Sequence, residues 1–317
     1  MKSDADLAAV DRDIVPRVPA WARPRGDVQR DADAGYFAGA ALNSLDNLVR
    51  SQPVWAGVWR QRLALKSAAA ALRLLGRTEE EPALRDAQLF RAAGDDPGPA
   101  GKVLLAWRRL AGRSTGLEEE AIRPVADLLD VKWDEALADV LANAEDLAGS
   151  PRPAPVVAAE LGAELYRARP DAELLAFWLA DAMLAQKLRW PLPVPLLMGH
   201  VASSAFKTGA PRRRIRPGGE GWGRVVLLVY AQAAAEACDL GADLGRRAAR
   251  VLEVAPKLRA KGSADVVKLL LDDDVLPASW SSAKLSERGA RRLFERLQDL
   301  GAVRELSGRP TFRLYGL

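Results

Sequence analysis

SERGARRLFERLQDLGAVRELSGRPTFRLY, residues 286–315, decides the architecture expected at the end of the chain. Ser286 is a good helix N-cap, and Gly301 follows Leu300 at the position where helices commonly end in a left-handed residue. The apolar residues between them share one face of a 3.6-residue wheel: Ala290, Leu293, Phe294, Leu297 and Leu300. The stretch therefore predicts an amphipathic helix that packs through one face and leaves the other face free.

A β-hairpin is predicted directly after this helix. Residues 302–306 and 311–315 read as strands, and the turn between them is Ser307, Gly308, Arg309 and Pro310. Gly308 gives the turn its permissive backbone, whereas Pro310 is tolerable only near a sheet edge. This is the only convincing strand pair that the sequence predicts.

Two further short helices are expected upstream, over residues 264–271 (ADVVKLLL) and 277–283, before a turn at Lys284 and Leu285. Three helices followed by a hairpin are the order of a winged helix-turn-helix, whose recognition helix enters the DNA major groove while the wing lies along the backbone. The sequence therefore predicts that residues 262–317 form a winged-helix domain.

Basic residues gather on the parts of this module that would face double-stranded DNA. Arginine can fork onto guanine or onto phosphate. The predicted DNA-binding residues are Arg288, Arg291 and Arg292 on the helix, Arg304, Arg309 and Arg313 on the hairpin, and Lys284 in the turn. The alternative is that the arginines merely solvate an exposed face and the module docks a protein or dimerises, because Glu287, Glu295 and Asp299 dilute the charge.

The rest of the chain predicts a mainly α protein with a multi-helix body. Apolar residues recur at helical spacing from Tyr36 onward, and prolines and glycines punctuate the pattern. We expect a poorly ordered arm over residues 1–33, anchored around 18–21, and an all-helical domain over 34–261. The tryptophans are expected in the core. Residues 207–220 are expected to form an exposed loop without regular structure.

Composition limits the classes of function. With 46 basic and 42 acidic residues the charge is only +4, so any case for nucleic acid must be local. One cysteine, Cys238, and one histidine, His200, leave no disulfide framework and no Cys/His zinc site, and we expect no cofactor. A charged N-terminus without a signal peptide, and Glu236 and Asp239 interrupting the most apolar segment, predict a cytoplasmic protein without a membrane span.

Several stretches resemble catalytic or phosphate-binding motifs but match them only weakly. Residues 112–116 (GRSTG) match a nucleophile-elbow pattern but follow a predicted helix instead of a strand. Residues 98–102 (GPAGK) lack the first glycine of a phosphate-binding loop, and Asp95 and Asp96 are better read as helix caps. The arginines of residues 212–216 could follow a phosphate backbone, order against an acidic partner, or simply be solvated.

Two resemblances add to these patterns. Residues 291–317 (RRLFERLQDLGAVRELSGRPTFRLYGL) resemble the C-terminal winged-helix segment of several bacterial proteins, some with a Fic-type domain, although the Fic motif is absent here. Over nearly its whole length the chain resembles the bacterial domain of unknown function 1403 family, through residues 55–65 (WAGVWRQRLAL), residues 95–111 (DDPGPAGKVLLAWRRLA) and the C-terminal run. That family is often associated with plasmids or other mobile DNA, so the resemblance implies a DNA-linked role.

Three functions are therefore open at this point. The first is a DNA-binding accessory or regulatory protein, whose helical body dimerises or senses a protein partner. The second is a helical protein-interaction scaffold without DNA contact. The third is an enzyme of the helical body, for which only carboxylates such as Glu118, Glu119, Glu120 and Asp181 are available, with no converging constellation in the sequence.

Overall fold

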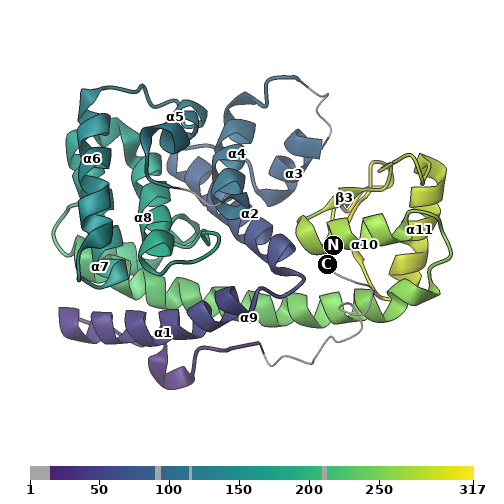
Figure 1. The fold of residues 1–317 in the computed structure, drawn as a ribbon, viewed down its shortest axis with the longest axis horizontal. Helices are drawn as coiled ribbons and strands as arrows, with labels where there is room; N and C mark the ends of the chain where they lie inside the picture. Colours follow the sequence, from purple (N-terminus) through teal and green to yellow (C-terminus); the bar gives the residue numbers. More distant parts are fainter. Residues whose placement is uncertain (1–14, 90–93, 114–115, 209–212) are drawn as a thin grey trace. The chain divides into compact units, whose positions relative to one another are not determined.

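The computed structural model describes residues 15–89, 94–113, 116–208 and 213–317, and it is mainly helical (Figure 1). Within these residues eleven α-helices account for most of the chain, and the strands are only two or three residues long. The predicted mainly α class is therefore confirmed. Contacts divide the chain into a larger unit, residues 17–51 with 63–238, and a smaller unit, residues 52–62 with 239–317.

The larger unit is a stack of helices around α8 (Glu173–Lys187), which is buried from residue 174 to residue 185. Figure 1 shows α8 beside α7 (Ala154–Ala168) and α6 (Glu135–Gly149). The remaining helices of this unit are α1 (Asp31–Ser51), most of α2 (Ala56–Leu74), α3 (Glu81–Leu89), α4 (Gly98–Gly112), α5 (Glu119–Leu128) and the first half of α9 (Trp222–Val254).

Tryptophans hold this core together, as predicted. The Trp178 indole nitrogen donates to the Ala106 carbonyl at 2.9 Å, and that of Trp222 donates to the Ala159 carbonyl at 2.8 Å. Each indole therefore buries its ring and still satisfies its N–H group. The other tryptophans buried in the two units are Trp55, Trp59, Trp107 and Trp190.

The start of the described chain agrees in part with the predicted arm. Val18 and Ala22 are buried, which fits the expected anchor, whereas Trp21 is 63% exposed. Helix α1 already begins at Asp31, inside the predicted arm. The first 14 residues of the arm lie outside the described residues.

Residues 207–220 contain a short strand pair, so the prediction of an irregular loop is wrong there. Strand β1 (Lys207–Thr208) pairs antiparallel with β2 (Arg213–Arg214). The Ile215 amide extends the pairing by donating to the Phe206 carbonyl at 2.7 Å, and the buried Phe206 ring fixes that end of the pair.

The smaller unit combines the second half of α9 with helices and a three-stranded sheet. Its elements after α9 are α10 (Ser263–Asp272), β3 (Leu276–Pro277), α11 (Glu287–Asp299), β4 (Arg304–Glu305) and β5 (Leu314–Gly316). The sheet order is β3-β5-β4, and both pairings are antiparallel. The predicted hairpin strands therefore exist, but a third strand joins them.

The helix predicted over residues 277–283 is absent, and the prediction is wrong. Pro277 belongs to β3 and lies opposite Leu314, and the Ala278 amide donates to the Arg313 carbonyl at 2.8 Å. Residues 278–285 then form turns closed by a bridge between Ser282 and Leu285. The backbone groups that a helix would have used are thus bonded to the sheet and to local turns, because proline and serine favour such alternatives.

The core of the smaller unit lies between α11 and the sheet. The Phe294 and Tyr315 rings stack with centroids 4.9 Å apart and planes 5° apart. On α2, the Arg62 guanidinium bonds to the carboxylate of Asp274, which is 3% exposed.

A predicted domain boundary at residue 262 would require residues 262–317 to fold on their own, and this stays a prediction.

In the part of the chain that the structure describes, one helical segment, Trp222–Lys257, is long and apolar enough to cross a membrane by length and composition. In the most apolar 18-residue stretch of this segment, 72% is buried inside the protein. Such burial is typical of a core helix of a folded protein.

Candidate nucleic-acid interface

The ends of α11 are fixed by local signals, as predicted. The Ser286 hydroxyl accepts a hydrogen bond from the Gly289 amide at 3.2 Å, which caps the first turn. Gly301 has a φ of +65°, and the next amide, Ala302, donates to the Leu297 carbonyl at 2.8 Å. The helix is therefore terminated at both ends by its own sequence.

The two faces of α11 also divide as predicted. The residues buried on the inner face are Ala290, Leu293, Phe294 and Leu297, and Leu300 is half-buried. Arg288, Arg291 and Arg292 are exposed on the outer face. DNA contact requires these guanidinium groups to be accessible, and they are not packed inside the protein.

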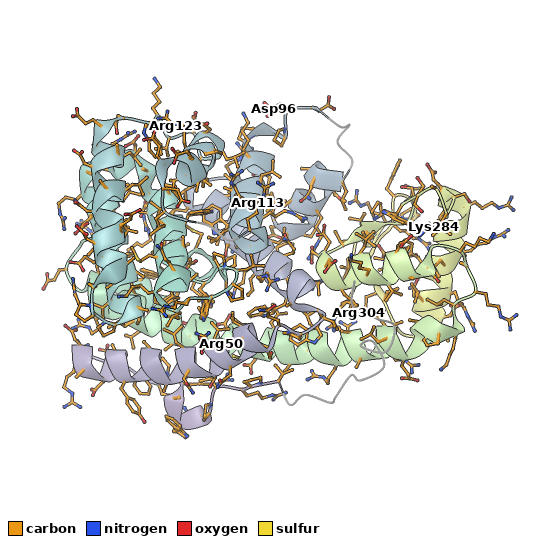
Figure 2. The ribbon with its side chains drawn as sticks, viewed as in Figure 1. Arg50, Asp96, Arg113, Arg123, Lys284 and Arg304 are labelled. Atoms are coloured by element: carbon orange, nitrogen blue, oxygen red, sulfur yellow. The ribbon has the colours of Figure 1, made fainter. Side chains whose placement is uncertain are left out.

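The other predicted basic residues also belong to the smaller unit. Lys284 is exposed in the turn before α11, and Arg304 is exposed on β4 (Figure 2). Arg313 is exposed and Arg309 is half-buried, both in the loop between β4 and β5. From residue 284 onward the chain carries eight basic and four acidic residues, so the segment has a local charge of +4.

Nearby carboxylates neutralise part of this charge. Lys284 Nζ lies 3.4 Å from Asp265 Oδ2, and Arg291 Nη2 lies 3.7 Å from Glu287 Oε2. Both pairs are exposed, and such pairs contribute little to stability and exchange readily with other anions. No ion pair within the described residues involves Arg288, Arg292 or Arg304, so these three are the least neutralised members of the set.

The loop between β4 and β5 is longer than the predicted four-residue turn. Residues 306–313 lie outside the two strands, because Arg304 pairs with Gly316 and Glu305 with Tyr315. Gly308 has a φ of +63°, as its predicted role in the turn requires. The predicted strand over 311–315 is therefore shortened at its start.

Two exposed side chains of this region were missed by sequence reasoning. Arg296 is exposed on α11, and helical spacing from Arg292 could have shown it. Phe312 is 70% exposed, although strand alternation would have put it on the same side as the buried Leu314. Its φ of +54° breaks that alternation, and no sequence pattern indicated this.

The arginines of residues 213–216 are partly committed to the protein's own structure. Arg214 Nη1 lies 2.6 Å from Glu173 Oε1, with both side chains mostly covered. The Arg216 guanidinium donates to the Tyr166 hydroxyl at 3.2 Å. Arg213 is exposed, and Arg212 lies outside the described residues. This segment is therefore a weaker candidate for phosphate contact than α11.

A polar cluster in the larger unit surrounds the only histidine. Lys66 Nζ lies 2.7 Å from Glu236 Oε2 and 3.4 Å from His200 Nε2, and His200 is 8% exposed. Burial and the neighbouring Lys66 ammonium lower the pKa of His200 to about 4, against the opposing effect of Glu236. His200 is therefore neutral near pH 7, and its nitrogen can accept from Lys66.

A second polar group, Asp181, is fully buried on α8. Its carboxylate accepts hydrogen bonds from the Leu196 amide at 2.8 Å and the Leu197 amide at 3.2 Å. Burial raises the pKa of Asp181 to about 7, and these amides and the Tyr230 hydroxyl oppose the shift. Asp181 ties the segment after α8 to the core, which is a structural role.

Within the described residues, the weak motifs bring no catalytic groups together. Asp96 accepts from the Gly98 amide, the first amide of α4, at 3.1 Å, although Pro97 and not Asp96 occupies the N-cap position of that helix. Ser114 and Thr115 of the GRSTG motif lie outside the described residues. Among the described residues, no hydrogen bond or ion pair joins Asp181 to the acidic group at residues 118–120. Within the same residues no group of three acidic, histidine or cysteine side chains is placed to hold a metal ion.

The fold and this surface define a mainly helical protein that presents a cationic helix face near its C-terminus. The chain belongs to the family described as protein of unknown function (DUF1403), whose sequence profile matches residues 6–317. The whole-length resemblance noted in the sequence is therefore confirmed. No curated protein matches the chain at a significant level.

Proposed function

We propose that the protein binds double-stranded DNA as an accessory or regulatory factor, through a winged helix-turn-helix formed by its C-terminal segment. The observation that carries the proposal is the outer face of α11, where Arg288, Arg291 and Arg292 are exposed on a helix whose inner face is buried. Arginine forks match phosphate oxygens and guanine edges, and a helix of this kind fits the major groove.

The order of elements supports this proposal. Helix α10, strand β3, helix α11 and the β4-β5 pair follow one another as the first helix, first strand, recognition helix and wing of a winged helix would. The departure lies in residues 278–285, where turns replace the helix that normally precedes the recognition helix. The inner face of α11 still has a sheet to pack against, as the Phe294–Tyr315 stack shows.

The arginines without ion pairs in this segment also support DNA binding. The arginines of α11 and the wing belong to one compact unit, and Arg288, Arg292 and Arg304 are among those that have no ion pair within the described residues. A polyanion gains most from such cations because binding releases condensed counterions. Glu295 and Asp299 on α11 reduce the attraction and are expected to limit non-specific affinity.

The test is the salt dependence of DNA binding. Each phosphate contact contributes about 0.9 to the slope of log affinity against log salt concentration. Replacing Arg288, Arg291 and Arg292 together by Gln is expected to reduce that slope by about 3. Raising the salt concentration from 50 to 200 mM is therefore expected to weaken DNA binding by the wild type about 40-fold more than binding by the variant. Fluorescence polarisation with a labelled duplex measures both proteins.

A matched control removes three arginines that have their own partners. Arg30, Arg123 and Arg246 have side chains that are 79%, 50% and 65% exposed, and each pairs with a carboxylate three or four residues away. Their replacement by Gln changes the net charge equally and is expected to leave most of the salt slope in place. Wild-type protein that retains no duplex at low salt, or a control variant that loses as much as the α11 variant, overturns the proposal.

A protein-interaction scaffold is the second candidate, and an aromatic surface on the larger unit favours it. Trp21 and Tyr36 are 63% and 60% exposed, with ring centroids 6.1 Å apart. Tyr36 borders a hollow of about 370 Å³, whose other lining residues are Asp27, Val28, Gln29, Arg30, Asp33 and Phe37. Exposed aromatic rings are enriched at protein interfaces. A complex with another protein or a second copy that survives high salt would distinguish this function from DNA binding.

A further inference from the structure

We propose that Phe312 is a wedge that the wing inserts into the DNA minor groove, where its ring unstacks a base step. The inference rests on the proposed function and adds a mode of contact that α11 does not provide. The recognition helix would read or follow the major groove, while the adjacent wing would bring one aromatic ring to the neighbouring minor groove.

The first observation is the exposure of Phe312. Its side chain is 70% exposed, more than any other large apolar residue of the described chain. The neighbouring residues on the strand, Leu314 and Tyr315, are almost completely buried. An aromatic ring this exposed contributes little to the core, because the hydrophobic effect scales with the area removed from water.

The second observation is the backbone of Phe312. Its φ of +54° lies in the left-handed region, which bulky L-residues rarely adopt. Strained backbone of this kind persists only where the surrounding structure imposes it, and it gathers at functional sites.

The third observation is that the loop is held at both ends. Glu305 accepts from the Ser307 amide at 2.7 Å and from the Gly308 amide at 3.1 Å, and Ser307 Oγ accepts from the Leu314 amide at 3.4 Å. Beyond Phe312, the Arg313 carbonyl accepts from the Ala278 amide of the neighbouring strand at 2.8 Å. The loop therefore presents its ring from a fixed frame.

The charge around the ring suits DNA better than a protein or a lipid surface. Arg313 follows Phe312 directly, Arg309 precedes it by three residues, and Arg304 is exposed on the first strand of the wing. Cations near an apolar side chain on the same loop can contact phosphates beside the groove that the side chain enters. Apolar side chains that enter the minor groove unstack flexible pyrimidine–purine steps, while arginines hold the adjacent backbone.

The experiment compares wild-type protein with Phe312→Gly, Phe312→Trp and, as a control at another exposed aromatic, Trp21→Ala. The probe is a mixed-sequence duplex of about 30 base pairs in which 2-aminopurine replaces adenine at several TA steps. Wild type is expected to raise 2-aminopurine fluorescence as a base step opens. Phe312→Gly is expected to bind about tenfold more weakly without that rise, since stacking on one ring carries such an effect. Phe312→Trp should retain both signals, and Trp21→Ala should resemble wild type.

Thermal unfolding separates a contact role from a structural one. Phe312→Gly relieves a positive φ and is expected to raise the melting temperature while it lowers DNA affinity. A wild type that binds no duplex refutes the proposed function itself. A wild type that binds with the expected salt dependence, together with unchanged binding of Phe312→Gly, no fluorescence rise, or a lowered melting temperature of Phe312→Gly, refutes the wedge alone.

Discussion

Two buried groups of the larger unit should make the free energy of unfolding depend on pH in opposite directions. Replacing one of them should make the contribution of each group measurable. Asp181 has its pKa raised by burial from 3.8 to about 7, and His200 has its pKa lowered by burial and by Lys66 from 6.5 to about 4. Replacing Asp181 by Asn keeps an oxygen for the two amides that it accepts from and imitates its neutral form. The variant removes one titration and leaves the other.

The sign follows from which state holds the proton. Between pH 3.8 and about 7 the folded protein keeps a proton on Asp181 that the unfolded chain has lost. Stability therefore falls as the pH rises through this window, by about 4 kcal/mol at about 1.4 kcal/mol for each pH unit. For His200 the unfolded chain holds the extra proton between pH 4 and 6.5, so stability rises with pH there, by about 3 kcal/mol. In the wild type the two effects nearly cancel.

Urea unfolding at pH 4, 5, 6, 7 and 8 measures the result, with Trp178 and Trp222 as fluorescent reporters in the same unit. Relative to wild type, Asp181→Asn is expected to gain stability from pH 4 to pH 7, by about 4 kcal/mol in total, and to level off above pH 7. His200→Gln is expected to show the opposite trend, by about 3 kcal/mol. Taking differences from wild type removes the contribution of every other titrating group.

A difference between Asp181→Asn and wild type that stays constant from pH 4 to pH 8 would refute this reasoning. It would mean that Asp181 titrates alike in the folded and unfolded chains, and that burial does not control its proton. A falling difference would mean that the amides of Leu196 and Leu197 stabilise the carboxylate more strongly than burial disfavours it.

Two further predictions concern stability alone. Ser286→Ala removes the cap of α11 and is expected to lower the free energy of unfolding by about 1 kcal/mol, measured by urea titration. Gly57→Ala would place a methyl group 2.6 Å from the Asp272 Cα atom and is expected to destabilise the protein by about 1–3 kcal/mol, whereas Gly39→Ala, with nothing within 4 Å, should stabilise it by about 0.5–1 kcal/mol. Equal melting temperatures for the two alanine variants would contradict the close approach at Gly57.

Local signals explain what the sequence could predict. The N-cap of α11, its left-handed end and its buried stripe all depend on residues within a few positions of one another, so Ser286, Gly301 and Phe294 could be placed before the structure was known. The tryptophan core follows the same logic, because helical spacing shows which rings share a face. The mainly α class rests on the same periodicity.

The parts that sequence reasoning missed depend on contacts between distant residues. Strand β3 forms because Leu276 and Pro277 meet β5, about forty residues later, and this pairing replaced the predicted helix. The polar cluster joins Lys66 to His200 and Glu236, which lie 134 and 170 residues further along the chain. No local pattern predicts such meetings, and the same holds for the reversed orientation of Phe312.

The division of the arginines shows why stability and binding should separate at α11. Arg62 and Arg214 face Asp274 and Glu173 with both partners of each pair mostly covered, so removing either arginine would leave a carboxylate poorly solvated and unpaired. Arg288 and Arg292 pair with no carboxylate within the described residues. Replacing them by Gln should therefore leave the free energy of unfolding nearly unchanged. The inner face of α11 is buried in the core, and on its outer face the only pairing described for Arg288, Arg291 and Arg292 is that of Arg291 with Glu287 on the same helix. Their guanidinium groups can therefore meet an external anion, and we expect a loss of DNA binding at unchanged stability when they are replaced.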